Sequence, residues 1–136
     1  MRANLWDARR RQRTERERRL AQQKVEIDIQ DKGDYKILVP VGDLDVYTVG
    51  SLRDALGKMI EDETPRVVVD LDGVPFMDSS GLGALMGGVR RLREAGGDLA
   101  ISCTREQHLK LFTITGFGEG VSIAPTVEEA AKGFRE

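Results

Sequence analysis

The run Val67-Val68-Val69 places the strongest constraint on how this 136-residue chain folds. Three consecutive β-branched residues, between Arg66 and Asp70, are typical of a short strand that is buried on both faces. Strands of this kind belong to a mostly parallel sheet covered by helices. The run therefore predicts an α/β fold, and the length of the chain is suited to one domain.

Two strands precede this run, and helices alternate with strands after it. Alternating apolar and polar residues predict strands at 25–29 and 35–41, joined by a turn at 31–34 into an antiparallel hairpin. Pro40 has no backbone N–H to donate, so we expect an edge or a bulge there. The later elements are expected to be a helix at 48–61, a strand at 66–71, a helix at 78–94 and a strand at 99–103. A capping box of Thr104 with Gln107 is expected to open the next helix, which is followed by a strand at 121–123 and a short helix opened by Thr126 with Glu129.

This order of elements, β-β-α-β-α-β-α-β-α, indicates a single domain with a mixed, mostly parallel sheet. Each of the two longer helices has an apolar stripe at three- and four-residue spacing, which we expect to face the core. The stripe of the helix at 48–61 is Val49, Leu52, Leu56, Met59 and Ile60. The stripe of the helix at 78–94 is Leu82, Leu85, Met86, Val89 and Leu92.

The charges of the chain are distributed unevenly. Residues 1–24 contain nine basic and three acidic residues, a net charge of +6, whereas the remainder carries −8. We therefore divide the chain into a basic arm at 1–23, either helical or disordered, and a domain at 24–136. Nucleic acid, an anionic lipid surface and an acidic partner protein all remain open as contacts for the arm.

Composition excludes several classes of protein. No run approaches the roughly 18 apolar residues of a membrane span, and no apolar segment follows the basic start as it would in a signal peptide. The single cysteine, Cys103, rules out an internal disulfide framework and is typical of a reducing cytoplasm. With one histidine, His108, a metal site built from His and Cys is not expected, and neither is a cofactor.

The segment 67–83 leads from the buried strand through a loop into the start of a helix. Asp78 is placed to cap that helix, and Ser79 and Ser80 then fall in its first turn. Backbone N–H groups are unpaired there and the helix dipole is positive, so a phosphate would be stabilised. A phosphate adds a charge of about −1.5 to −2 beside Asp78 and would change the local field sharply. The junction is therefore a candidate for a switch controlled by phosphorylation.

Common enzyme motifs are absent from this segment. Gly81 and Gly83 begin a dinucleotide-binding pattern, but Met86 stands where the third glycine is needed. The chain has no Gly-Lys-Ser/Thr sequence and hence no phosphate-binding P-loop. A nucleophile elbow also fails, because neither serine has a glycine two residues before it.

The remaining candidates for acid–base chemistry are His108 and the pair Asp43 and Asp45. His108 lies among apolar residues of its helix, which is typical of a structural or half-exposed histidine. Two acids in a loop between a strand and a helix are typical turn and cap residues. We therefore assign no catalytic residue and expect no enzyme activity.

Two stretches of the sequence resemble a known family. Phe76-Met77-Asp78-Ser79-Ser80-Gly81-Leu82-Gly83, preceded by Gly42-Asp43-Leu44-Asp45, resembles the anti-sigma factor antagonists, single-domain bacterial members of the STAS family. The resemblance covers about 25–134 and implies a STAS-like domain. It also implies partner switching: the unphosphorylated protein binds an anti-sigma factor that is also a serine kinase, and a sigma factor is released to support transcription. The kinase then phosphorylates the antagonist and the complex dissociates, and a PP2C-type phosphatase reverses the modification.

The resemblance also assigns roles to residues. It implies that Ser79 is the phosphorylation site and that Asp45 lies near it. The implied partner-binding residues are Asp45, Asp78, Ser80, Gly81, Leu82 and Gly83. Asp43 departs from the family, which usually has glutamate at that place. No direct binding to DNA is expected.

Two alternatives to the antagonist remain. The first is a scaffold subunit of a stress-signalling or transporter-associated assembly, for which the basic arm would serve as a docking segment. The second is a nucleotide-binding or hydrolysing enzyme, supported only by the glycines between Gly81 and Gly88. The absence of a P-loop lysine counts strongly against the second alternative.

Overall fold

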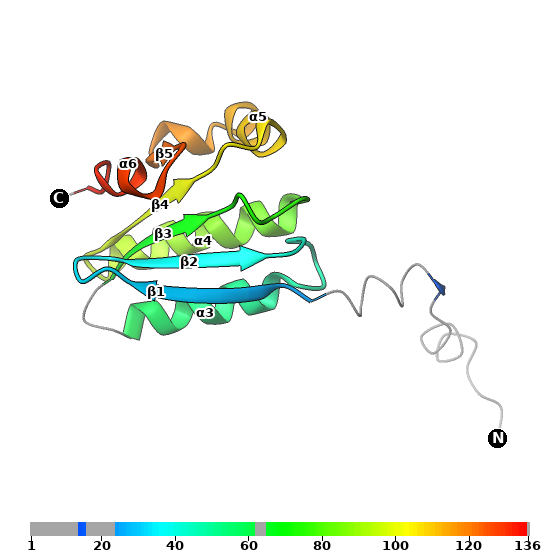
Figure 1. The fold of residues 1–136 in the computed structure, drawn as a ribbon, viewed down its shortest axis with the longest axis horizontal. Helices are drawn as coiled ribbons and strands as arrows, with labels where there is room; N and C mark the ends of the chain where they lie inside the picture. The colour runs from blue at the N-terminus through cyan, green and yellow to red at the C-terminus, as the bar shows by residue number, and fades with distance from the viewer. Residues whose placement is uncertain (1–13, 16–23, 62–64, 136) are drawn as a thin grey trace, which may run out of the picture.

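The computed structural model of the chain describes residues 14–15, 24–61 and 65–135 (Figure 1). The basic arm expected at 1–23 lies outside the described residues, apart from Thr14 and Glu15. The described domain is built on one five-stranded sheet, in which the strands stand side by side in the order of the chain. Strands β1 (Glu26–Asp31) and β2 (Lys36–Val41) are antiparallel. Strands β3 (Arg66–Asp70), β4 (Asp98–Ser102) and β5 (Ile123–Ala124) continue the sheet in parallel with β2.

Helices cover both faces of this sheet (Figure 1). Helices α3 (Val49–Glu61) and α4 (Ser79–Glu94) pack on one face, and the short α6 (Val127–Ala131) packs on the other. Helix α5 (Glu106–Thr115) and the 3₁₀ turn η1 (Phe117–Glu119) connect β4 to β5. The observed order of elements confirms the predicted α/β fold with its mixed, mostly parallel sheet.

The valines of β3 show why this strand is decisive for the fold. Val67, Val68 and Val69 are each fully buried. Val67 and Val69 belong to the larger core cluster beneath α3 and α4, whereas Val68 belongs to the smaller cluster with Ala130 of α6. Because successive side chains of a strand point to opposite faces, β3 needs cover on both sides. The prediction of a strand buried on both faces is confirmed.

Pro40 lies at a local edge within β2. The antiparallel pairing with β1 is continuous and places Pro40 opposite Ile27, so the strand has no bulge there. The parallel pairing with β3 ends earlier, at Leu38. Pro40 therefore stands where β2 has a paired strand on one side only, a position that tolerates the missing N–H.

The predicted capping box at the start of α5 is wrong. Helix α5 begins at Glu106, and its N-cap residue Arg105 makes no side-chain cap. Thr104 instead donates to the carboxylate of Asp72, through its backbone N at 2.7 Å and its Oγ1 at 3.0 Å. A carboxylate is a stronger acceptor than a neutral group, so the tertiary contact replaces the local cap.

Two smaller expectations also differ from the structure. Met86, assigned to the buried stripe of α4, is 53% exposed and lies beside a hollow lined also by Phe117. The other members of that stripe already occupy the side of α4 that faces the sheet. The last strand, predicted at 121–123, is found at Ile123–Ala124, where the backbone N of Cys103 donates to the Ala124 carbonyl oxygen.

Candidate functional site

The two family-like stretches meet at one end of the sheet, where the chain leaves β2 and β3. The backbone N of Leu44 donates to the Phe76 carbonyl oxygen at 2.9 Å, and the backbone N of Asp78 donates to the Leu44 carbonyl oxygen at 3.1 Å. These bonds form an isolated parallel bridge between Leu44 and Met77. The loop at 42–48 is therefore fixed beside the residues that open α4.

Asp78 caps α4, as the sequence predicts. Its Oδ1 accepts the backbone N–H of Ser80 at 2.8 Å and that of Gly81 at 3.4 Å. Ser79 is the first residue of the helix and is exposed, whereas Ser80 is half-buried. The structure thus presents the Ser79 residue to solvent at the positive end of a helix of four turns or more.

Replacing Asp78 with alanine is expected to lower the free energy of unfolding by about 1 kcal/mol, because the first N–H groups of α4 lose their acceptor. Chemical denaturation of both proteins measures this difference. Asp78→Asn retains an acceptor oxygen and is the matched control, with an expected loss close to zero. An equal loss in both variants would show that the negative charge, rather than the cap, stabilises the helix.

Three of the expected partner-binding residues are buried: Asp45 in its loop, and Gly81 and Leu82 in α4. Leu82 is 7% exposed and belongs to the core. Gly81 is also buried, and a Cβ at that position would stand 2.6 Å from Met77 Cγ and 3.0 Å from the Leu44 carbonyl oxygen. Gly81 and Leu82 are therefore packed in the interior beneath the start of α4 and do not form part of its exposed surface. Gly83, in contrast, is exposed, with open space where a Cβ would stand.

Asp45 is turned inward and holds the shape of its loop. Its carboxylate is buried and accepts the backbone N–H of Tyr47 at 2.9 Å and that of Thr48 at 3.2 Å. The Thr48 hydroxyl donates to the carbonyl oxygen of Asp43, which is half-buried. The interpretation of Asp45 as a turn residue is confirmed, and any effect on a partner would act through the loop.

Exposed apolar side chains lie on the two loops that meet beside the start of α4, and the sequence analysis missed them. Val46 is 65% exposed, Tyr47 47% and Phe76 53%. We call these three residues the apolar rim. The sequence gave little indication that these three side chains are exposed, because apolar residues in loops often turn inward. Exposure of large apolar groups next to one another marks an interaction surface.

The loop between β3 and α4, which carries Phe76, is tied to α5 and to the residue before it. His108 is 2% exposed, and its Nε2 lies 2.6 Å from the Val74 carbonyl oxygen. The Nε of Arg105 donates to the Asp72 carbonyl oxygen at 2.9 Å. The structural interpretation of His108 is therefore confirmed, because it joins α5 to the loop between β3 and α4.

The described residues offer little for metal binding or nucleophilic catalysis. In 14–15, 24–61 and 65–135, no group of three or more His, Cys, Asp or Glu residues is arranged to hold a metal ion. Cys103 is buried, and this burial raises the pKa of its thiol despite an opposing backbone hydrogen bond from Arg105. A thiol with a raised pKa is protonated near neutral pH and is a poor nucleophile.

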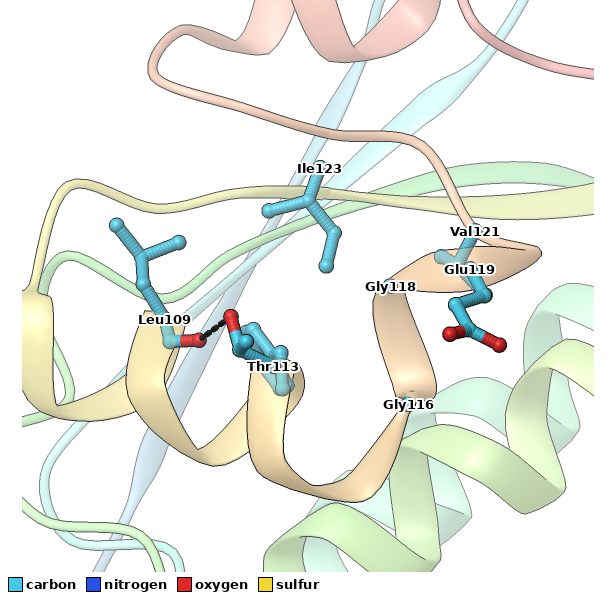
Figure 2. Close-up of a pocket in the computed structure, with 8 residues that line it drawn as sticks. Leu109, Thr113, Gly116, Gly118, Glu119, Val121 and Ile123 are labelled. Carbon is cyan, nitrogen blue, oxygen red and sulfur yellow. Dashed lines mark hydrogen bonds between the residues drawn. The ribbon is translucent and has the colours of Figure 1, made fainter.

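A cavity of about 410 Å³ lies elsewhere in the domain, between α5, η1 and β5 (Figure 2). Within it, the Thr113 hydroxyl donates to the Leu109 carbonyl oxygen at 3.0 Å (Figure 2). Among the described lining residues, Glu119 alone carries a charge, so no acid–base pair is available there. The lining residues are Leu109, Phe112, Thr113, Gly116, Gly118, Glu119, Val121 and Ile123.

No helix in the described part of the chain has the length and apolar character needed to cross a membrane.

The five-stranded sheet with helices on both faces, and the two loops joined at one end of it, define an α/β domain whose family a comparison identifies. The STAS domain family model matches residues 26–130. The chain therefore belongs to the STAS domain family.

Curated relatives of this chain carry the name anti-sigma-B factor antagonist. The protein of that name from Staphylococcus aureus (strain NCTC 8325 / PS 47) is 39% identical over 92 residues, which are 68% of this chain and 83% of the relative. The Staphylococcus epidermidis protein is 41% identical over 75 residues, which are 55% of this chain and 69% of the relative.

Solved structures of anti-sigma factor antagonists share the fold. The antagonist from Mycobacterium paratuberculosis aligns with a TM-score of 0.74 and 22% identity, over 82% of this chain and 95% of its own. The phosphorylated form of the Bacillus cell fate determinant SpoIIAA aligns with a TM-score of 0.62 and 24% identity, over 79% of this chain and 97% of its own. At these identities the likeness concerns the fold.

Proposed function

We propose that this protein is an anti-sigma factor antagonist switched by phosphorylation of Ser79. The observation that carries the proposal is the exposed Ser79 at the capped start of α4, next to the two joined loops that bear the apolar rim. The names of the curated relatives support the same class of protein. The unphosphorylated form binds an anti-sigma factor that is also a serine kinase, and a sigma factor is released.

Ser79 is a better phosphoacceptor than Ser80 for a geometric reason. A kinase must bring its nucleotide within bonding distance of the hydroxyl, and Ser79 is exposed whereas Ser80 is half-buried. The backbone N of Ser80 is also held by the Asp78 carboxylate. A PP2C-type phosphatase removes the phosphate, and this chain contributes binding rather than catalysis to the cycle.

The partner surface combines the apolar rim with the exposed face of α4. Gly83 leaves room for close approach, and the rim supplies apolar area to be buried. The backbone beneath this surface is fixed at the start of α4, where Asp78 accepts the N–H groups of Ser80 and Gly81 and the next residue is the buried Leu82. Asp45 fixes the neighbouring loop by accepting the N–H of Tyr47. We assign partner switching to the domain at 24–136 and leave the arm at 1–23 outside this surface.

Phe76→Ala is expected to weaken binding to the kinase about tenfold, the typical cost of truncating an aromatic side chain that anchors an interface. Its stability is expected to change little, because Phe76 is 53% exposed. Calorimetric titration against the purified kinase without ATP measures the affinity. The matched control is Ile114→Ala, an apolar truncation at a residue of α5 that is 80% exposed. Equal affinities for Phe76→Ala and the unaltered protein would place the interface elsewhere.

Phosphate-affinity electrophoresis tests the proposed modification. The unaltered chain, Ser79→Ala and Ser80→Ala are each incubated with ATP in a lysate of the native organism. A retarded band that is present in the unaltered chain and Ser80→Ala, and absent from Ser79→Ala, is the expected result. Retardation that persists in Ser79→Ala would assign the phosphate to another residue and overturn the proposal as stated.

A further inference from the structure

His108 is a buried titratable side chain to which the proposed function gives no role. It lies on α5, is 2% exposed and has the half-buried Leu109 as its neighbour. Burial of a polar ring costs free energy unless the ring is hydrogen-bonded. The Nε2 atom of His108 lies 2.6 Å from the carbonyl oxygen of Val74, a residue 34 positions away in the chain. A carbonyl oxygen can only accept a hydrogen bond, so Nε2 carries the proton and donates it to Val74.

This hydrogen bond is one of several that hold the loop between β3 and α4 from two sides. On the side of α5, Thr104 donates to the Asp72 carboxylate through its backbone N at 2.7 Å and its Oγ1 at 3.0 Å. On the side of β2, the backbone N of Gly42 donates to the Gly73 carbonyl oxygen at 3.1 Å. The loop therefore lies between two segments that are distant from it in the chain, and each of them supplies donors to it.

Phe76 belongs to a part of this loop whose backbone is fixed at two points. The carbonyl oxygen of Val74, two residues earlier, accepts from His108. The carbonyl oxygen of Phe76 itself accepts the backbone N–H of Leu44 at 2.9 Å. The side chains of Val74 and Met77 are buried, whereas that of Phe76 is 53% exposed. Because the backbone is held at both points, Phe76 has little freedom to turn away from solvent.

We propose that His108 is a positioning residue for partner binding, which holds the backbone at Val74 so that Phe76 is presented to the partner. The proposal rests on the proposed function, in which Phe76 is an anchor of the interface with the kinase. An aromatic side chain that is already held in its binding orientation loses less freedom on association. His108 is too deeply buried to touch a partner, so its effect on binding acts through Phe76.

His108→Leu is expected to weaken binding of the full chain to the purified kinase about fivefold, within the range of coupling between residues of one contact network. Leucine occupies the space of the ring but donates no hydrogen bond to Val74. His108→Gln is the conservative variant, because its amide nitrogen can donate to the same oxygen. We expect His108→Gln to retain most of the affinity. Calorimetric titration in the absence of ATP measures both variants.

A double-mutant cycle separates positioning from a general loss of stability. In a chain that already carries Phe76→Ala, His108→Leu should have almost no further effect on affinity, because the side chain that it positions is gone. The matched control is Thr126→Ala, which removes the N-cap of α6 on the other face of the sheet and lowers stability there. We expect Thr126→Ala to bind the kinase as the unaltered chain does. Chemical denaturation first establishes conditions in which every variant is folded.

Equal affinities of His108→Leu and the unaltered chain would overturn the proposal. So would a loss of affinity that is the same with and without the Phe76 side chain, or a loss that Thr126→Ala shares. If His108→Leu fails to fold, His108→Met replaces it in the same cycle, because the flexible methionine side chain adapts to an irregular space. An additive cycle overturns this proposal alone, whereas unchanged affinity of Phe76→Ala overturns the proposed interface together with it.

Discussion

Phosphorylation of Ser79 is expected to weaken binding of the partner kinase at least 100-fold, which corresponds to about 2.7 kcal/mol. The phosphate adds about −1.5 to −2 charges beside the Asp78 carboxylate. It also lies beside the two joined loops that bear the apolar rim, so the complex would have to remove a dianion from water. Like charges and desolvation at an interface each cost up to several kcal/mol, so no large conformational change is required.

Calorimetric titration of the kinase with the phosphorylated and unphosphorylated chains, in the absence of ATP, measures this loss. Ser79→Asp is expected to follow the phosphorylated chain in part, and Ser79→Ala should bind as the unmodified chain does. Gln30→Glu is the matched charge control, because it adds one negative charge to an exposed residue near the far end of β1. Unchanged affinity of the phosphorylated chain would refute the switch.

The same comparison tests the physical mechanism of the switch. A local electrostatic and steric effect should change backbone chemical shifts only at 42–48 and 76–86, which the Leu44 hydrogen bonds place together. Shifts that extend through the sheet to α6 would instead indicate a conformational change.

The second large effect is expected at Gly81, whose alanine variant should lose about 2–3 kcal/mol of unfolding free energy, the typical cost of overpacking. A Cβ there would stand 2.6 Å from Met77 Cγ and 3.0 Å from the Leu44 carbonyl oxygen. The Leu44 oxygen already accepts the N–H of Asp78, so relief of the clash would disturb the contact between the two loops. Chemical denaturation measures the loss.

Gly83→Ala is the matched control in the same helix. A Cβ at Gly83 meets nothing within 4 Å, and alanine is the better helix former. We therefore expect Gly83→Ala to raise the free energy of unfolding by about 0.5–1 kcal/mol. Similar stabilities for the two variants would show that the loops can separate at little cost, and would weaken the structural role of Gly81.

Local sequence patterns predicted most of the fold correctly. The valine run predicted β3, and the apolar stripe of α3 predicted its buried face, except that Ile60 is only half-buried. Asp78 was predicted as the cap of α4, because an N-cap depends on residues two and three positions away. The capping box of Thr104 was wrong, because its competitor, Asp72, lies far away in the chain.

The candidate site was only partly predictable. Ser79 was predicted as the phosphoacceptor from its motif and its place at the start of a helix, and the structure gives it an exposed position. The apolar stripe of α4 predicted that Leu82 is buried, but nothing in the motif revealed that Asp45 is buried or that Tyr47 and Phe76 are exposed. Burial of a side chain in a loop depends on neighbours from other elements, which no local pattern contains.

The sequence by itself determined the elements, their order, the capped helix start and the separation of charge between arm and domain. Each of these follows from composition or from residues within a few positions of one another. Only the tertiary structure decided which loop lies beside the start of α4 that carries Ser79. The physical reason is that Leu44 binds the backbone of Phe76 and Asp78, and this contact joins segments that are distant in the chain.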